Sequence, residues 1–224
     1  MLRLILSDLH LGNPLFKHES ELLNLLYYDF DEIIFCGDIL DIWESPIDKI
    51  ISKYSNLISY INRRAIDIKI IIIHGNHDPD ISKLKEIFFS CLVYESYEYN
   101  NNIVIHGDEF DEFILNYSSL ARWLSYFNLI FEKIGLDLKT FFRELFYSIS
   151  AKRQKIYYND LVSNIEKSVV DKYFNSFSTV IMGHTHMPKI VGSKCLYINV
   201  GDMIHNYTYV LDNGYNFKLY NLRR

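Results

Sequence analysis

Hydrophobic residues fall in short unbroken runs along the first third of the chain, and segments with helical spacing separate these runs. The runs at residues 2–6, 33–36 and 68–73 have the length and β-branched content of buried strands. Between them, residues 19–28 and 48–64 repeat apolar side chains at the spacing of an amphipathic helix. This alternation of apolar strands and helices is typical of a parallel sheet that helices cover on its faces. We therefore expect an α/β fold, with further strands at residues 103–105 and 179–181.

The last segments of the chain have a different pattern. Residues 196–200, 208–211 and 217–220 alternate more strongly, and the turn residues Asp212-Asn213-Gly214 separate the last two of them. We expect these three segments to belong to the second sheet of a two-sheet sandwich.

Residues 110–174 form a long aromatic-rich stretch with helical periodicity. Its apolar side chains define three successive helix faces, and Gly135 separates the first from the second. The third face contains Leu161, Val162, Ile165 and Val169. Because this stretch separates two of the polar motifs described below, we expect it to lie beside them as a helical cap. Residues 1–224 are then one domain with a helical insertion.

Composition and charge narrow the class of protein. The chain has 224 residues, of which 49% are hydrophobic, and a net charge of -5, which argues against a stable nucleic-acid partner. Cys36, Cys91 and Cys195 are far apart and are expected to be buried free thiols in a reducing compartment. A strand begins at residue 2, so we expect neither a signal peptide nor a membrane span. The expected location is the cytoplasm, with at most peripheral contact at the inner membrane surface.

Five short polar motifs follow predicted strands, and all five carry metal-binding side chains. They are Asp8-Leu9-His10, Gly37-Asp38, Gly75-Asn76-His77-Asp78, His106-Gly107-Asp108 and Gly183-His184-Thr185-His186. Ligands of parallel α/β sheets bind at the carboxyl ends of the strands, which is where these motifs lie. Carboxylate, amide and imidazole donors suit Mn²⁺, Fe²⁺, Zn²⁺ or Mg²⁺. The pattern predicts two divalent metal ions, with Asp38 suited to bridge them, and attack by a metal-bound hydroxide on a phosphate ester or anhydride.

Several other polar residues have two interpretations from the sequence. His18, His74 and His205 are interpreted as ordinary core or surface histidines. Asp41 and Glu44 lie either around the metal ligands or at a solvated helix start, and the second interpretation is favoured. The acidic residues Asp108, Glu109 and Asp111 either orient ligands or form an exposed loop, and the sequence does not decide between these.

Together the five motifs resemble those of the calcineurin-like metallophosphoesterase superfamily, and they span Asp8 to His186. The resemblance implies a four-layer α/β/β/α sandwich and two metal ions, for which we expect Mn²⁺ with Fe²⁺, Zn²⁺ or Mg²⁺ as alternatives. It assigns one ion to Asp8, His10, Asp38 and His186, and the other to Asp38, Asn76, His106 and His184. It also implies that Asn76, His77 and His184 contact the substrate. His77 is then the catalytic histidine, and Asp78 pairs with it and fixes its tautomer.

A finer resemblance points to one subgroup. Residues 7–12, residues 106–111 and Gly201-Asp202 are similar to segments of the UDP-2,3-diacylglucosamine pyrophosphohydrolases of lipid A synthesis. This implies that a UDP-linked acylated sugar, or a related lipid-linked pyrophosphate, is split into UMP and a lipid monophosphate. The enzymes of that subgroup carry arginine where this chain has His77, which favours the general superfamily pattern.

The insertion contributes a second set of expected substrate contacts. Its aromatic helices are suited to enclose an acyl chain or to touch a membrane. The cluster Lys152, Arg153 and Lys155 then either binds a second phosphate or anionic headgroups, or is a solvated helix start.

Two alternatives from other classes remain open. One is a phosphodiesterase or phosphatase that acts on nucleotides or nucleic-acid ends. The other is a non-catalytic scaffold that binds a partner through the aromatic helices. The complete set of predicted metal ligands argues against the scaffold.

Overall fold

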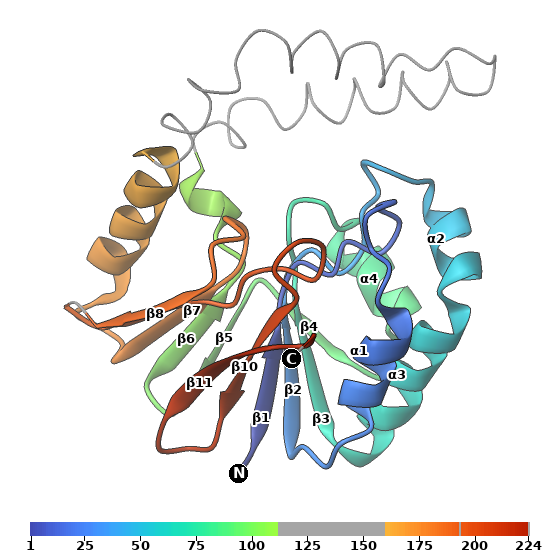
Figure 1. Cartoon of the computed structure of the whole chain (residues 1–224), viewed down its shortest axis with the longest axis horizontal. Coiled ribbons are helices and arrows are strands. Elements are labelled where there is room, and N and C mark those ends of the chain that lie inside the picture. Colours follow the sequence, from blue (N-terminus) through green and yellow to red (C-terminus); the bar gives the residue numbers. More distant parts are fainter. Residues whose placement is uncertain (112–159, 193, 224) are drawn as a thin grey trace, which may run out of the picture.

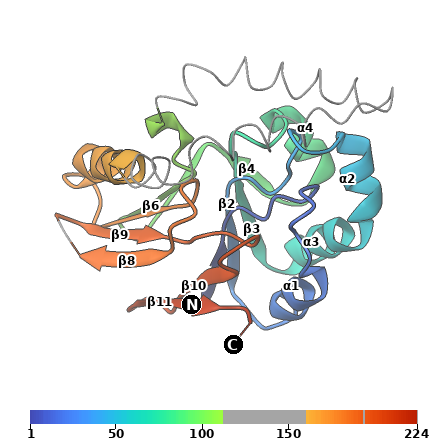
Figure 2. The ribbon, with the colours of Figure 1, turned by 45° about the horizontal axis from the view of Figure 1, so that its top comes forward.

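Two β-sheets lie face to face at the centre of the computed structural model, which describes residues 1–111, 160–192 and 194–223. Helices α1–α4 cover the outer face of one sheet, and a helix at residues 160–173 covers the outer face of the other (Figure 1). The same order of layers is visible in the turned view of Figure 2. The predicted α/β/β/α sandwich is therefore confirmed.

The first sheet has six strands in the order β11-β10-β1-β2-β3-β4. Strands β1 to β4 run parallel, and the three strands and the first helix predicted for this half are present. The strands are β1 (Arg3–Leu6), β2 (Glu32–Cys36), β3 (Lys69–Ile73), β4 (Leu92–Tyr94), β10 (Thr208–Asp212) and β11 (Phe217–Asn221). The helices are α1 (Glu19–Leu26), α2 (Ile47–Lys53), α3 (Ser55–Asp67) and α4 (Ile81–Ile87).

The second sheet has five strands in the order β5-β6-β7-β9-β8. Strands β6, β7 and β9 run parallel, while β5 and β8 are antiparallel edge strands. The bounds are β5 (Ser96–Tyr99), β6 (Asn102–Ile105), β7 (Thr179–Met182), β8 (Lys189–Gly192) and β9 (Leu196–Asn199). Ile5, Ile34 and Ile71 of the first sheet form an apolar core with Val104 and Ile181 of the second. Because this core fixes the two sheets against each other, the strand ends of both sheets can contribute to one site.

Two sequence-based predictions need correction. Residues 208–211 and 217–220 were expected in the second sheet, but β10 pairs antiparallel with β1 and so extends the first sheet. This pairing covers the edge of β1, which would otherwise be left with unpaired backbone groups. The single helix predicted at residues 48–64 is divided into α2 and α3 at Tyr54, whose buried ring contacts Phe16 at 5.6 Å between ring centroids.

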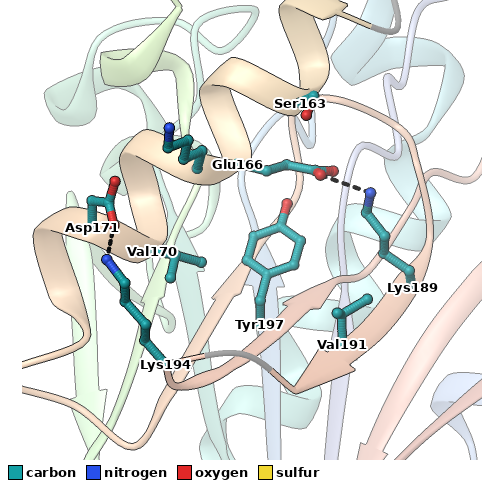
Figure 3. Close-up of a pocket in the computed structure, with 9 residues that line it drawn as sticks. Ser163, Glu166, Val170, Asp171, Lys189, Val191, Lys194 and Tyr197 are labelled. Atoms are coloured by element: carbon teal, nitrogen blue, oxygen red, sulfur yellow. Dashed lines mark hydrogen bonds and ion pairs between the residues drawn. The ribbon is translucent and has the colours of Figure 1, made fainter.

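The helix at residues 160–173 forms the fourth layer. Val162, Ile165 and Val169, predicted to lie on one apolar face, are buried, and Ile165 and Val169 pack against side chains of the second sheet. Two ion pairs, marked in Figure 3, tie the helix to the β8–β9 hairpin: Glu166 with Lys189 at 2.7 Å and Asp171 with Lys194 at 2.6 Å. This part of the predicted insertion therefore covers a sheet face.

The remainder of the predicted cap, residues 112–159 with Lys152, Arg153 and Lys155, lies outside the described residues, and the cap stays a prediction. Within the described ranges, no helix combines the length and the apolar content that a membrane span requires. The cysteines are free, with Cys36 and Cys195 buried and Cys91 half-buried.

Candidate metal centre

Five parallel strands deliver the predicted ligands to one edge of the sandwich. The motifs follow β1, β2, β3, β6 and β7, and the loops after these strands lie along the upper edge of the two sheets in Figure 1. Five of the predicted ligands have a left-handed backbone, with φ angles of 51° at Asp8, 49° at His10, 51° at Asp38, 60° at His184 and 54° at His186. Non-glycine residues adopt this conformation at a cost of about 1–3 kcal/mol each, so surrounding contacts must hold it. The sharp turns direct side chains from separate strands toward each other.

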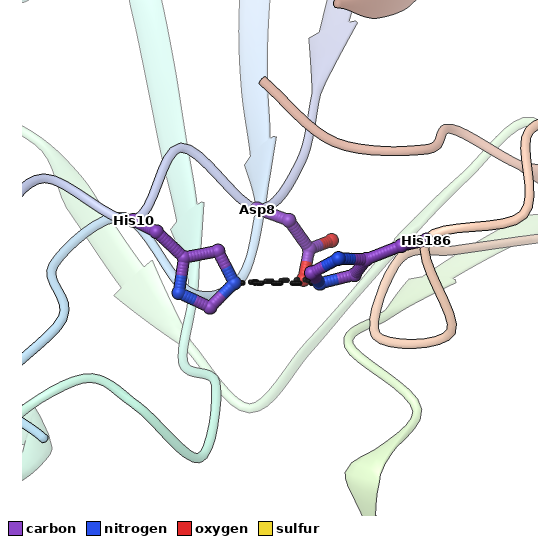
Figure 4. Close-up of side chains that lie close together, drawn as sticks. All are labelled: Asp8, His10 and His186. Atoms are coloured by element: carbon purple, nitrogen blue, oxygen red, sulfur yellow. Dashed lines mark hydrogen bonds and ion pairs between the residues drawn. The ribbon is translucent and has the colours of Figure 1, made fainter. Parts of the chain in front are cut away.

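One half of the centre contains Asp8, His10 and His186, shown in Figure 4. Asp8 Oδ1 lies 3.0 Å from His186 Nε2 and 3.6 Å from His10 Nε2. The two Nε2 atoms are 3.4 Å apart. Because all these donor atoms face the same point, they fit a single divalent ion.

The other half contains Asp38, His106 and Asn76. His106 Nε2 lies 3.2 Å from Asp38 Oδ2 and 3.2 Å from Asn76 Oδ1. The same Asp38 oxygen is 3.8 Å from His10 Nε2, in the first half of the centre. This position fits a carboxylate shared between two ions, so the bridging role predicted for Asp38 is compatible with the geometry.

Hydrogen bonds to the far side of the histidine rings set which nitrogen faces the centre. His10 Nδ1 donates to Asp41 Oδ2 at 3.1 Å, and His106 Nδ1 donates to the carbonyl oxygen of Cys36 at 3.0 Å. In both residues Nε2 is then left as the ligand atom. His184 is arranged in the opposite way, since its Nε2 lies 3.1 Å from Asp111 Oδ2 and Nδ1 remains.

The structure distinguishes the contacts of two acidic residues, Asp111 and Glu109, whose roles the sequence left undecided. Asp111 orients His184, whereas Glu109 contacts Lys172 at 2.9 Å and Tyr173 at 3.1 Å on helix 160–173. Asp111 therefore contacts a predicted metal ligand, and Glu109 anchors the fourth layer.

His77 has a different carboxylate partner from the one predicted. Its Nδ1 lies 3.0 Å from Asp41 Oδ1, and the indole ring of Trp43 stacks on the imidazole at 4.2 Å between centroids. The sequence interpretation of Asp41 as a solvated helix-start residue is wrong, because its side chain is only 1% exposed and contacts both His10 and His77. Hydrogen bonds from the Asp41 and Ile42 amides to Leu11 and His77 hold this loop inside the site.

Asp78 acts on the backbone and does not pair with His77. Its two carboxylate oxygens accept hydrogen bonds from the amides of Leu40 at 2.8 Å and Gly75 at 3.1 Å. Burial and the charge of Asp38 raise the pKa of Asp78 to about 8. Asp78 therefore joins the loops that carry Asp38 and Asn76, and its predicted role in fixing the His77 tautomer is wrong.

Glycines give the ligands room to approach each other. A Cβ atom on Gly37 would lie 2.3 Å from His106 Nδ1, and one on Gly183 would lie 2.3 Å from Asp8 Oδ2. In each case the glycine of one motif leaves space for a ligand of another. The glycines next to the ligands are thus part of the packing of the centre.

The charges of the centre favour a bound cation. Burial opposes ionisation of Asp38, but the charges of His106 and His77 outweigh it and hold the Asp38 pKa below its ordinary value. Burial likewise opposes the charged form of His106, yet Asp38 raises the His106 pKa to about 10. Without a metal, protonated histidines balance the buried carboxylates. Divalent ions would replace those protons, so the donor set fits a metal centre.

The centre opens into a cavity of about 300 Å³. Five predicted ligands line it, as does His77, whose side chain is 24% exposed. His205 also lines the cavity, although the sequence indicated an ordinary histidine. The neighbouring Gly201-Asp202 motif was the available signal, because Asp202 is fully buried and organises the turn that contains His205.

Comparison with solved structures found matches that cover nearly the whole chain. Yfce, a phosphoesterase from E. coli, is 14% identical with a TM-score of 0.51, over 99% of this chain and 93% of that one. An archaeal phosphodiesterase is 16% identical with a TM-score of 0.49, over 98% and 99%. A Vps29 single mutant from Entamoeba histolytica is 12% identical with a TM-score of 0.46, over 98% and 91%. At these identities the likeness to Yfce shows the fold alone.

Comparison with curated proteins found no match. The sequence model of the calcineurin-like phosphoesterases matches residues 1–188, which include all five motifs. The chain therefore belongs to the calcineurin-like phosphoesterase family and is a metal-dependent phosphoester hydrolase.

Proposed function

We propose that this chain hydrolyses a phosphoric diester or pyrophosphate at a centre of two divalent ions. The observation that carries the proposal is the position of Asp38 Oδ2, 3.2 Å from His106 Nε2 and 3.8 Å from His10 Nε2. Asp8, His10, Asp38 and His186 would hold one ion, and Asp38, Asn76, His106 and His184 the other. We propose Mn²⁺ for both, because mixed carboxylate, amide and imidazole donors suit it.

Two divalent ions, when bound, supply Lewis acidity that lowers the pKa of a coordinated water and neutralises charge on the phosphoryl oxygens. Asp8 and Asp38 contribute the buried negative charge that retains the ions. Asp41 and the Cys36 carbonyl keep the rings of His10 and His106 oriented, so little reorganisation is required when substrate enters.

His77 is the proposed proton donor to the leaving oxygen. Asp41 accepts a hydrogen bond from Nδ1–H, so the proton for the leaving oxygen would be a second one, carried on Nε2 by the imidazolium form of His77. His77 also lines the cavity beside the ligands, within the space that a substrate phosphate would enter. This arrangement suits general acid catalysis.

For the substrate we propose a UDP-linked acylated sugar or a related lipid-linked pyrophosphate. The support is the sequence resemblance of residues 7–12, residues 106–111 and Gly201-Asp202. A nucleotide diester is the second candidate, because His77 stands where the lipid A enzymes carry arginine. Both substrates place a phosphate over the same residues.

A Mn²⁺-supplemented assay that compares a UDP-linked diacyl sugar with plain nucleotide diesters, read by phosphorus NMR, tests the proposal. We expect UMP to appear from the lipid-linked substrate, and we expect no turnover in EDTA or with Asp38→Asn. Preference for the plain diester would replace the lipid substrate by the second candidate. Failure to hydrolyse either one with metal bound would overturn the proposed function.

A further inference from the structure

A tight turn after β9 brings His205 to the mouth of the metal cavity. Asp202 is fully buried, and its Oδ1 accepts hydrogen bonds from the amides of Ile204 at 2.7 Å and Asn206 at 3.2 Å. The amide of His205 donates to the same oxygen. These bonds define the backbone of the turn without using the imidazole of His205.

The turn is attached directly to two of the metal-binding motifs. The Met203 amide donates to the carbonyl oxygen of Asp8 at 3.0 Å, and Asn206 Nδ2 donates to the carbonyl oxygen of His186 at 2.8 Å. The position of His205 is therefore fixed relative to the ion that Asp8 and His186 would hold.

Apart from the proposed metal ions, few groups in this cavity are able to bind an anion. No lysine or arginine lines it among the residues that the structure describes, and Asp41 and Glu44 add negative charge. Asn13 Nδ2 already donates to Asp41. The imidazole of His205 is 65% exposed, and its Nδ1 lies 3.9 Å from Asp202, beyond hydrogen-bond distance.

We infer that His205 binds a second phosphate next to the scissile one, and so selects pyrophosphate-containing substrates over simple phosphate esters. His205 and His77 reach the cavity from different sheets, since one follows β9 and the other follows β3. His77 donates a proton to the leaving oxygen at the scissile phosphate, and His205 donates a hydrogen bond to the neighbouring phosphate. This inference rests on the proposed function and adds a specificity residue to it.

Binding measurements separate this role from a general effect on the site. We would titrate Mn²⁺-loaded protein, freed of excess metal, with UMP and with α,β-methylene-UDP, which has a second phosphate and resists hydrolysis. We expect wild-type protein to bind the diphosphate analogue more tightly. His205→Ala should weaken that binding by about tenfold, as expected for one hydrogen bond to a charged group, while UMP binding hardly changes.

Two further variants control for other effects. His205→Gln keeps an N–H donor and should restore most of the preference. His18→Ala removes an imidazole that contacts Glu21 and Arg223 outside the cavity, and it should match wild type. Folding of His205→Ala is not at risk, because the turn is held by backbone amides.

Equal weakening of both ligands in His205→Ala, or no preference in the wild type, would overturn the inference while leaving the proposed function intact. If metal-loaded wild-type protein bound neither UMP nor α,β-methylene-UDP, the inference and the proposed function would both be overturned. Since the titration requires no turnover, it is independent of the hydrolysis assay.

Discussion

His77 and Asp41 form a hydrogen bond of 3.0 Å between Nδ1 and Oδ1, and the other oxygen of Asp41 lies 3.1 Å from His10 Nδ1. A single buried carboxylate thus orients the proposed proton donor and a predicted metal ligand together. Burial opposes the charge on Asp41, but hydrogen bonds from the two histidines outweigh it and lower the Asp41 pKa. The carboxylate is therefore ionised when it accepts both bonds.

Replacing Asp41 by Asn tests this shared role. The amide has one acceptor oxygen, so it is unable to accept from both histidines. We expect metal affinity to fall by about 10- to 100-fold, as is usual when a residue that orients a ligand is lost. At saturating Mn²⁺ we expect kcat to stay lower by about 100-fold or more, because His77 loses its orientation. Metal titration and steady-state kinetics measure the two effects separately.

The variant Asp78→Asn is the comparison for Asp41→Asn, because it replaces the other buried carboxylate near His77. It places an amide NH2 against the amides of Leu40 and Gly75, so it should reduce thermal stability, and kcat at saturating metal should fall less than in Asp41→Asn. If kcat fell more in Asp78→Asn than in Asp41→Asn, Asp78 would be the residue that fixes the tautomer of His77.

His77→Ala is expected to keep its metal content and lose most turnover. If His77 protonates the leaving oxygen, the loss should be larger for an alkyl ester than for a p-nitrophenyl ester, whose leaving group needs little protonation. His74→Ala is a matched control, because the His74 ring faces Glu95 at 3.7 Å and does not line the cavity. Unchanged kcat in His77→Ala with metal bound would refute the role.

The residues that sequence analysis located well are those with a local signal. Asp8, Asp38, Asn76 and His184 each lie within three residues of the end of an apolar strand, and parallel strands end at one edge of a sheet. The position of such residues follows from the strand itself. Their convergence could therefore be predicted before the rest of the fold was known.

The burial of Asp41, the cavity-lining position of His205 and the sheet that β10 joins all depend on distant contacts. Asp41 looks like a solvated residue before a helix, but its burial results from hydrogen bonds of its loop to Leu11 and His77. His205 gains its position from a turn bound to Asp8 and His186. The sheet that β10 joins depends on the free edge of β1, which is more than 200 residues away in sequence. No local pattern contains this information.

Gly183→Ala tests whether the glycines keep the metal ligands in position. An added Cβ would lie 1.8 Å from Ser7 Oγ and 2.3 Å from Asp8 Oδ2, so Asp8 must move. We expect a large loss of metal affinity, measured by titration of the metal-free protein. Gly192→Ala on β8 is the matched control, since no atom lies within 4 Å of the added carbon. Equal metal affinities in the two variants would show that the Gly183 contact is relieved without moving Asp8.

The stability of the metal-free protein should depend on pH in a direction set by His106. Burial lowers the tendency of His106 to carry a proton, but Asp38 outweighs it and raises the His106 pKa to about 10, above the unfolded value of about 6.5. The protonated form is therefore favoured by folding. Its stabilising contribution is complete below about pH 6.5 and is lost as the pH rises through about 10.

We expect the Tm of EDTA-treated protein to fall between about pH 7 and about pH 9, because His106 of the unfolded chain has lost its proton there while folded His106 retains the proton that balances Asp38. Protein loaded with Mn²⁺ should show a smaller fall, because the cation replaces that proton and binds better to neutral imidazole. Thermal unfolding followed by circular dichroism at several pH values, with and without metal, measures the difference. Replacing His106 by Gln should flatten the metal-free curve, since the titrating group is gone. Parallel pH curves for the metal-free and metal-loaded proteins would contradict the assignment of His106 as the residue whose proton the metal displaces.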